Sequence, residues 1–402
     1  MRKQRYIILE QPGRPAAAPP AGKRGVRGQG LEGMGSILKK DATAPELELK
    51  TDEMTAAEAA QRGKEKNVQG IVPWMPTLLI RSKPSKAAIK TNWGIDAVGA
   101  VASAFDGSGV KVAVLDTGIK QDHPAFAGIA IEQQDFTNSP SGTDDQDGHG
   151  THCAGTIFGR DVDGIRIGVA RGISEALIGK VLGDDGSGDS LALFKAVQWA
   201  AQSGANIISM SLGFDFPRMV QIAQDEDGLP LDLAVSNALV NYRLNLRAFD
   251  TLLAHLRVSE AWGGNAIIVA AAGNESRREA DADFRISASL PAAADGVISV
   301  AALGMRQKRL GIADFSNSDP MISAPGIDIL SASINGGLEA MNGTSQACPH
   351  VAGLAALWWQ KLRDEGAKAT PATVSEKLLA SARPLVDEID WVDCGRGLAV
   401  AP

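Results

Sequence analysis

A short stretch near the carboxyl-terminal end of the chain combines a glycine turn, small hydroxyl groups and an apolar run. It reads NGTSQACPHVAG over residues 342–353, and its small and apolar residues predict a buried helix. A hydroxyl at a helix N-terminus lies beside unpaired backbone N–H groups and the positive end of the helix dipole, which favour negative charge. Ser345 is therefore a candidate nucleophile, although a serine at this place can also simply cap the helix.

A serine hydroxyl becomes a strong nucleophile when an imidazole takes its proton and a carboxylate orients that imidazole. The chain offers both groups. Asp116 closes a strand-like run in VAVLDTGI, and His149 lies between two glycines in DGHGTHCAGT, where a helix is expected to begin. Asp116 can also cap a helix or bind a metal, and His149 can be an ordinary loop histidine. Together with Ser345, the two residues point to acyl transfer.

Strand-like and helix-like segments alternate from Trp93 onward, which predicts parallel strands joined by crossover helices. The predicted fold is α/β, with a doubly wound, mainly parallel sheet that carries helices on both faces. Sites in such sheets lie at the carboxyl ends of strands, where Asp116, Gly213 and Asn274 fall. The expected strands are 110–115, 176–181, 207–212, 266–272 and 297–303, and the expected helices are 148–158 and a segment capped by Ser190.

The composition is that of a globular protein, because 44% of the 402 residues are apolar and 22% are charged. The net charge of −7 and the lack of a long lysine or arginine run argue against a nucleic acid or an anionic membrane as partner. The apolar run that follows the basic start is too short for a signal peptide, and no run approaches transmembrane length. We therefore expect a cytoplasmic location, with export by a non-classical route left open.

The first 90 residues follow a different pattern and predict a separate small α+β domain, 1–90, ahead of a large domain at 93–402. A stretch rich in proline, glycine, alanine and arginine at about 11–35 predicts a flexible loop, and a polar stretch at about 80–92 predicts a linker. The small domain is expected to contain strands at 5–10 and 46–50, a helix at 54–66 started by Thr51 or Asp52, and an extended segment at 68–80.

Three separate stretches carry a family resemblance. VAVLDTGI, HGTHCAGT and NGTSQACPHVAG, in this order, resemble the Asp, His and Ser motifs of the subtilisin-like serine proteases, or subtilases, with the thiol-containing HGTHC form of the histidine motif. The order differs from that of the α/β-hydrolases, which run Ser, Asp, His. The resemblance implies that Ser345 attacks a peptide carbonyl, that His149 acts as base and then acid, and that Asp116 orients His149. It also implies that Asn274, in AAAGNES, and the backbone N–H of Ser345 hold the oxyanion.

The same resemblance implies how a substrate binds. An edge strand is expected to pair with the backbone of the substrate, which then binds as an added strand, and a second stretch is expected to form one wall of the primary specificity pocket. The edge strand would be formed by Ser211, Leu212 and Gly213, and the pocket wall by Ala271, Ala272 and Gly273.

Residues 1–90 resemble a subtilase propeptide, which templates folding and inhibits the cleft of its own chain. Such a unit is expected to be cut off between about Ile80 and Asn92. The expected function is thus a serine endopeptidase that acts on polypeptides through an acyl-enzyme and is made as a self-processing zymogen. Two alternatives stay open: a permanently attached regulatory module in place of the propeptide, and a catalytically silent relative that binds peptides or regulates a partner.

The chain departs from the family pattern at the usual calcium site. The family often has an aspartate two residues after the histidine of a His-Pro pair, but here His123-Pro124 is followed by Ala125 and Phe126, which counts against that site. The acidic residues 144–147 can bind a cation or form a solvated loop, so any metal stays unknown and calcium stays open. The expected chemistry requires no cofactor. Cys153, one helical turn after His149, is expected to be a buried structural thiol.

The segment at about 215–262 is long for this family. Apolar residues recur within it at alternating steps of three and four, which predicts a long amphipathic helix. They are Leu239, Tyr242, Leu246, Phe249, Leu253 and Leu256. Such a helix can pack on the sheet as a crossover, or it can serve as an interface or a lid.

Overall fold

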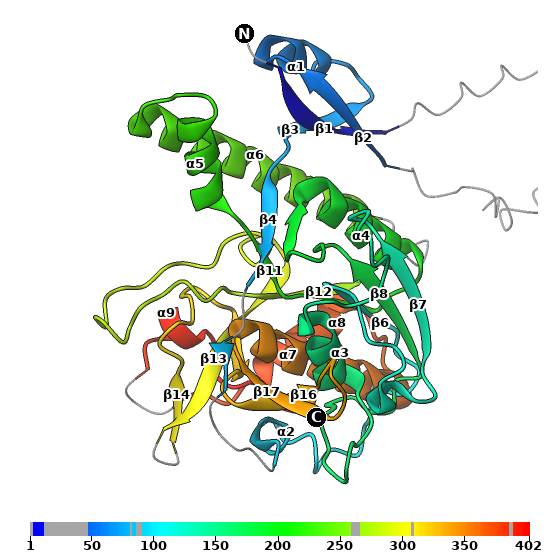
Figure 1. Cartoon of the computed structure of the whole chain (residues 1–402). Helices are drawn as coiled ribbons and strands as arrows, with labels where there is room; N and C mark the ends of the chain where they lie inside the picture. Colours follow the sequence, from blue (N-terminus) through cyan, green and yellow to red (C-terminus); the bar gives the residue numbers. More distant parts are fainter. Residues whose placement is uncertain are drawn as a thin grey trace, which may run out of the picture.

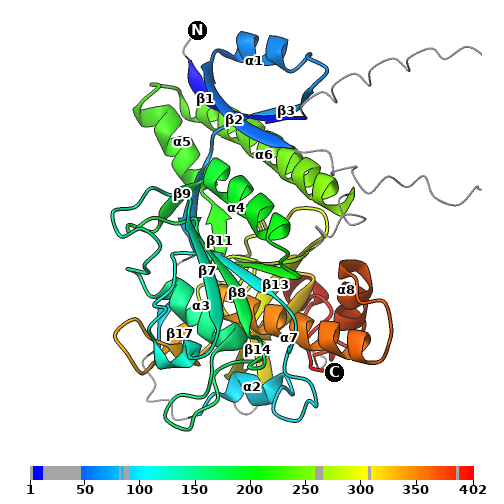
Figure 2. The same cartoon turned by 90° about the vertical axis from the view of Figure 1, so that its right-hand side faces the viewer.

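The computed structural model describes residues 3–11, 47–80, 83–85, 91–258, 266–306, 309–385 and 389–402. Nearly all of the loop predicted at about 11–35, and much of the linker predicted at 80–92, lie outside these residues. A central sheet with helices on both sides forms the body of the molecule, and a smaller sheet near the N-terminus sits above it in both views (Figure 1, Figure 2).

The central sheet is mainly parallel. Its order is β14-β13-β12-β10-β6-β8-β7, with β15 beside β13, and of these strands β14 alone pairs antiparallel, at one edge. The inner strands are buried on both faces, which explains their continuous apolar runs. The prediction of a doubly wound α/β fold is confirmed. The strands are β6 (Val112–Asp116), β7 (Ala130–Asp135), β8 (Glu175–Lys180), β10 (Ile207–Met210), β12 (Ile267–Ala271), β13 (Val297–Arg306), β14 (Arg309–Ile312) and β15 (Ile322–Pro325).

The helices of the larger domain begin close to the predicted positions, with one corrected cap. Helix α4 starts at Ser190, but the capping side chain belongs to Asp189, which accepts the N–H of Ala192 at 2.8 Å. A carboxylate suits the positive end of a helix better than a neutral hydroxyl does. The helices of the described chain are α1 (Ala56–Arg62), α2 (Trp93–Ala97), the 3₁₀ turn η1 (Pro124–Phe126), α3 (His149–Phe158), α4 (Ser190–Gln202), α5 (Phe216–Asp225), α6 (Leu231–Val258), α7 (Thr344–Asp364), α8 (Pro371–Ala380) and α9 (Trp391–Cys394).

Alternate residues of the central strands point into two separate cores. Val112 and Val114 of β6 belong to the core that contains α3 and α7. Ala113 and Leu115 of the same strand belong to the opposite core, which contains α4 and α6. The side-chain period of two in a strand thus places helices on both faces of the sheet.

The long segment after β11 forms two helices, α5 and α6. Phe249 and Leu253 of α6 are buried, and the Phe249 ring lies 5.6 Å from that of Phe194 on α4, so this half of α6 packs against the sheet layer as the apolar pattern predicts. Leu239 is 56% exposed, which the pattern did not predict. The first half of α6 packs against α5 instead, where the Phe216 and Tyr242 rings meet edge to face.

The small N-terminal sheet is antiparallel, in the order β2-β1-β3, with α1 on one of its faces (Figure 1). Alternate residues of β1 separate again: Tyr6 and Ile8 pack in a small cluster with Ala59 of α1, whereas Ile7 and Leu9 join the core of α4 and α6. This sheet therefore docks on those two helices. Its strands are β1 (Gln4–Glu10), β2 (Glu48–Met54) and β3 (Val68–Pro73).

One prediction in this region is wrong. The helix is not started by Thr51 or Asp52 but by Thr55, which forms a capping box with Glu58. Strand pairing explains the shift, because Thr51 lies opposite Ile7 in β1 and is held in β2. The segment 68–80 contains two strands, so its extended form is confirmed, and it is divided, because β3 stays in the small sheet and the residues after it enter another one.

The described chain contains two further sheets of three strands each. The predicted strand 207–212 divides between β10 of the central sheet and β11 of the first of these small sheets. Their orders are β11-β4-β9 and β16-β17-β5. The strands are β4 (Pro76–Leu79), β9 (Ser187–Asp189) and β11 (Leu212–Phe214) in one, and β5 (Lys83–Pro84), β16 (Ile329–Ala332) and β17 (Leu338–Asn342) in the other.

Candidate active site

Asp116 and His149 are joined by a buried hydrogen bond. Asp116 is the last residue of β6, and His149 is the first residue of α3, so a strand end and a helix start meet here. The His149 Nδ1 atom lies 2.8 Å from Asp116 Oδ1, and both side chains are buried. The same Oδ1 accepts the backbone N–H of Thr117 at 2.8 Å. The backbone of Thr117 therefore helps to hold the carboxylate in the orientation in which it bonds the imidazole.

The pKa of His149 lies well above its usual value of 6.5. Burial alone lowers this pKa, because it disfavours the charged ring, but the negative charge of Asp116 beside Nδ1 outweighs burial. An imidazole paired in this way binds a proton readily. Such a ring suits a group that must accept a proton during a reaction.

Ser345 is buried in the first turn of α7. Its Oγ lies 3.1 Å from the backbone carbonyl oxygen of Ile80, to which it donates a hydrogen bond. The Nε2 atom of His149 makes no hydrogen bond within the described part of the chain. The serine hydroxyl thus faces a peptide carbonyl of the chain itself.

The backbone carbonyl of Ser345 is held by two side chains. In a regular helix it would accept the N–H of the residue four positions on, but that residue is Pro349, which has none. The Sγ of Cys153, at 3.3 Å, and the Oγ of Ser211, at 3.2 Å, donate to it instead. Burial raises the pKa of Cys153, which keeps this thiol protonated. The expectation of a buried structural thiol is confirmed.

Asn274 follows β12 and is fixed from the side of α7. Its Oδ1 accepts both the backbone N–H and the hydroxyl of Thr344, each at 2.9 Å. Its Nδ2 lies close to Gly343, where a Cβ would stand 3.1 Å away. The carbonyl of the side chain is thus used for positioning, and the amide points toward the turn that carries Ser345.

The three residues predicted to form an edge strand lie around β11, and the strand next to them belongs to the chain itself. β4 lies between β11 and β9 and pairs antiparallel with both, and Figure 1 labels β4 and its neighbour β11. Leu212 is opposite Leu79, and Gly213 is opposite Leu78. Gly213 also faces Ile80, whose side-chain carbon would stand 3.6 Å from a Cβ there. Ser211 lies just ahead of β11 and bonds to Ser345.

Ala271 is the last residue of β12, and Ala272 and Gly273 follow it directly before Asn274. Ala271 and Ala272 are buried, and Gly273 has a φ of 115°, a left-handed value that favours glycine. A side chain there would also meet the Asn317 amide, which donates to Glu275 at 2.6 Å. The structure thus brings the predicted pocket wall and Asn274 to the same edge of the sheet.

A comparison with known families shows the family of the chain. The model of the subtilase family matches residues 107–397. The chain belongs to the subtilase family. Subtilisin DY of Bacillus licheniformis is 31% identical over 299 residues, which cover 74% of this chain and 91% of that protein. The major intracellular serine protease of Bacillus subtilis (strain 168) is 33% identical over 265 residues, with coverages of 64% and 70%.

A third relative, thermitase of Thermoactinomyces vulgaris, is 29% identical over 252 residues, which cover 63% of this chain and 75% of that protein. This subtilase is accordingly a subtilisin-like serine endopeptidase, a hydrolase that acts on polypeptides. Among its described helices, none combines the length and apolar character that a membrane crossing requires.

Two of the positions that a metal could occupy in this subtilase do not fit one. Ala125 and Phe126 are buried in η1 and offer no side-chain oxygen. Asp145 is buried, unlike its acidic neighbours. The ligand atoms of Asp116, His149 and Cys153 lie within 4.8 Å of one another, but Asp116 and His149 already bond to each other at 2.8 Å. A metal there would have to break that bond, so these residues do not fit a resident ion.

Proposed function

We propose that Asp116, His149 and Ser345 form the catalytic triad of this subtilase. In this proposal His149 takes the proton of Ser345 as the hydroxyl attacks a peptide carbonyl, and it later gives that proton to the leaving amine. Asp116 holds the ring through Nδ1, so Nε2 is the atom left to face the serine. The three side chains supply nucleophile, base and counter-charge, so the reaction requires no cofactor.

Asn274 and the backbone N–H of Ser345 would stabilise the oxyanion of the tetrahedral intermediate. Support comes from Thr344, which donates two hydrogen bonds to the Oδ1 of Asn274. These bonds orient the side chain so that its NH₂ group is the donor. A donor fixed in advance needs no reorganisation when charge develops, and this is where most of its effect on rate arises.

We further propose that the protein is a zymogen whose N-terminal unit, up to Ile80, is a propeptide. The observation that carries this proposal is the distance of 3.1 Å between Ser345 Oγ and the carbonyl oxygen of Ile80. β4 leads to this carbonyl while paired on both sides, as an extended substrate would be. The bond between Ile80 and Arg81 is therefore the expected cleavage site, although Arg81 itself lies outside the described residues.

Contacts on both sides of this bond support the proposal. Beyond it, β5 pairs with β17, with Lys83 opposite Asn342. Ahead of it, the small sheet docks on α4 and α6, where Gln198 donates to the carbonyl of Leu47 at 2.6 Å and Asn245 donates to that of Pro73 at 2.9 Å. The unit would act as an intramolecular inhibitor of the catalytic domain at 93–402, because its strand fills the place of a substrate.

Intact mass spectrometry of the purified full chain tests the proposal. The wild-type chain should convert with time into two fragments that meet between Ile80 and Arg81, whereas Ser345→Ala should stay whole. Ser381→Ala serves as a matched control, because Ser381 bonds only within the end of α8 in the described structure and should leave cleavage unchanged. A wild-type chain that hydrolyses an added peptide yet stays uncut would overturn the propeptide assignment in favour of a permanent regulatory module. A wild-type chain that does neither, and whose Ser345 resists an organophosphonate, would overturn the triad.

A further inference from the structure

Thr117 directly follows Asp116, and each of its polar groups is engaged. Its backbone N–H donates to Asp116 Oδ1 at 2.8 Å. Its hydroxyl accepts the backbone N–H of Gly150 at 2.9 Å and donates to Asp145 Oδ1 at 2.8 Å. Its carbonyl accepts from Lys180 Nζ at 2.8 Å. The residue is buried, so water does not compete for these bonds.

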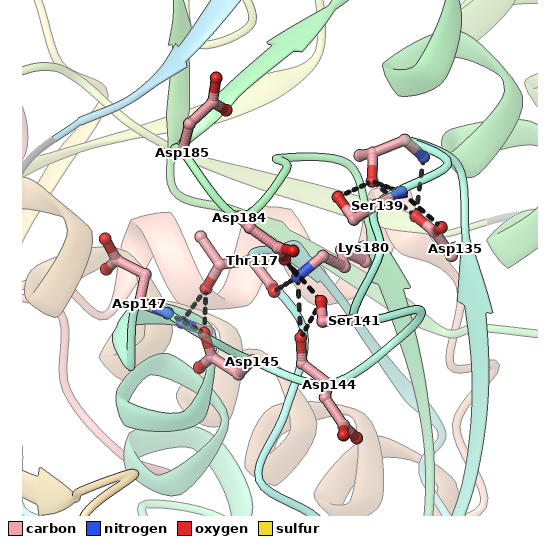
Figure 3. Close-up of polar contacts among 12 residues, drawn as sticks. Thr117, Asp135, Ser139, Ser141, Asp144, Asp145, Asp147, Lys180, Asp184 and Asp185 are labelled. Carbon is pink, nitrogen blue, oxygen red and sulfur yellow. Dashed lines mark hydrogen bonds and ion pairs between the residues drawn. The ribbon is translucent and has the colours of Figure 1, made fainter.

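Asp145 connects Thr117 to the first turn of α3. It accepts the backbone N–H groups of Gly148 at 2.9 Å and of Thr151 at 2.9 Å, and also the Thr151 hydroxyl at 2.7 Å. Figure 3 shows its carboxylate turned toward Thr117, while the carboxylate of Asp147 points away. A buried carboxylate at the positive end of α3 stabilises the turn that begins with His149.

Lys180 holds the other side of Thr117. It ends β8 beside Asp116 and is completely buried. Its ammonium group donates to the carbonyls of Thr117 and Asp144, each at 2.8 Å, and pairs with Asp184 Oδ1 at 2.9 Å. These three acceptors match the three protons of the group, as Figure 3 shows. A buried charge with all its bonds made is a rigid anchor.

The turn after Asp116 also lies very close to α3. A Cβ on Gly150 would stand 2.2 Å from the carbonyl oxygen of Gly118, so only glycine fits between the two segments. The backbones of the two segments are therefore in close contact at this point. The hydroxyl of Thr117 bridges this contact and is the only side-chain atom that bonds both Gly150 and Asp145 in the described structure.

We propose that Thr117 is a positioning residue that sets the placement of His149 against Asp116. Through its hydroxyl and Asp145 it ties the strand that carries Asp116 to the helix that carries His149, and Lys180 fixes its backbone from the opposite side. This inference rests on the triad proposed above. Loss of the hydroxyl removes the acceptor of the Gly150 N–H, while Asp145 Oδ1 keeps only the N–H groups of Asp147 at 3.1 Å and Gly148 at 2.9 Å, so the strand and α3 lose the bridge that joins them.

The test compares two substitutions at Thr117 in the full chain. Thr117→Val keeps the shape but removes the hydroxyl, whereas Thr117→Ser keeps the hydroxyl. The readout is the first-order rate of self-cleavage after Ile80, per folded molecule. We expect a rate about 10- to 100-fold lower for the valine variant, because displacements of about 1 Å cost up to about 100-fold in rate. The serine variant should stay within about 3-fold of wild type. Thr137→Val, whose hydroxyl bonds Asp135 away from the triad, is the matched control and should cleave normally.

A second readout separates positioning from simple stabilisation and does not need catalysis. In the uncut Ser345→Ala chain, the proton on His149 Nδ1 should give a downfield proton resonance that reports its bond to Asp116. Thr117→Val should shift or broaden this resonance, and Thr117→Ser should restore it. A valine variant that melts earlier but keeps both the resonance and the cleavage rate would show a purely structural role and overturn the proposal. Equal losses for valine and serine would overturn it as well. If the wild type itself fails to cleave, the propeptide proposal fails, and the rate of hydrolysis of an added peptide, together with the resonance, decides the role of Thr117.

Discussion

Asn245 is the residue of α6 whose removal should most directly loosen the N-terminal unit. Its side chain is completely buried, and its Nδ2 donates to the carbonyl of Pro73 at 2.9 Å and to that of Asn241 at 2.9 Å. Pro73 is the last residue of β3, just ahead of the strand in the cleft. Asn245→Ala would leave this buried carbonyl without the donor while the rest of the contact stays in place.

The size of the effect follows from the bond that is lost. A buried acceptor left without its partner costs about 1–3 kcal/mol, and about 1.4 kcal/mol changes a dissociation constant tenfold. We therefore expect the separated N-terminal fragment to inhibit the Asn245→Ala catalytic domain about 5- to 140-fold more weakly than it inhibits wild type. Most of the change should be in the rate of release, since the approach of the two parts is unaffected.

The assay measures peptide hydrolysis against added fragment, with the concentration of active sites determined by titration. Thr251→Ala is the matched control on the same helix, because its hydroxyl bonds Arg247 within α6 and makes no described contact with the N-terminal unit. An inhibition constant that is the same for Asn245→Ala and wild type would refute the reasoning. So would an equal weakening by both variants, which would indicate a general loss of helix stability.

Three further predictions concern the catalytic domain. Because Asp116 holds the pKa of His149 above its usual 6.5, kcat/KM should rise with pH, and the midpoint of this rise should lie above 6.5. A midpoint at or below 6.5 would contradict the pairing of His149 with Asp116. Asn274→Ala should lower kcat by roughly 10²–10³ with KM little changed, the loss established for the corresponding asparagine of subtilisin, and steady-state kinetics that show only a raised KM would contradict the oxyanion role. Burial lowers the pKa of His152 to about 3 and that of His350 to about 4, below the usual 6.5 of an unfolded chain. The unfolded chain therefore binds protons first as the pH falls below about 6.5, so the fold is most stable above that pH and loses stability as the pH approaches the folded-state pKa values. For His350 the loss is up to about 3 kcal/mol, measurable by urea unfolding of uncut Ser345→Ala between pH 7 and 4.5, and NMR titration of either ring near 6.5 in the folded protein would contradict it.

Sequence reasoning locates residues whose position depends on local pattern. Asp116, His149 and Ser345 lie at a strand end and two helix starts, and the topology of a parallel sheet brings such ends to one edge. Their proximity follows from the order of elements rather than from any single contact. For this reason the fold class and the members of the candidate site could be predicted without coordinates.

Features that depend on distant partners could not be predicted in this way. Thr51 has the composition of a helix start, but its pairing with Ile7, far away in the sequence, keeps it in a strand. Leu239 fits an apolar stripe, yet it is exposed because that part of α6 contacts α5 rather than the sheet. The sequence does not distinguish Asp145 from its acidic neighbours. Its role depends on hydrogen bonds from the hydroxyl of Thr117 and from N–H groups at the start of α3, which only the folded chain brings to it. The entry of β4 between β11 and β9 likewise requires knowledge of two other segments.

The chain passes through its own cleft, with β4 paired on one side of Ser345 and β5 paired on the other. In the zymogen proposed above, the inhibitory strand is tethered while the chain is intact, and its effective concentration at Ser345 is set by chain length rather than by the amount of protein. A cut after Ile80 turns the same strand into a separate ligand that obeys mass action. Cleavage should therefore proceed equally well at any protein concentration, whereas the appearance of activity should depend on dilution. A cell could hold a stock of cut but silent enzyme simply by keeping it concentrated.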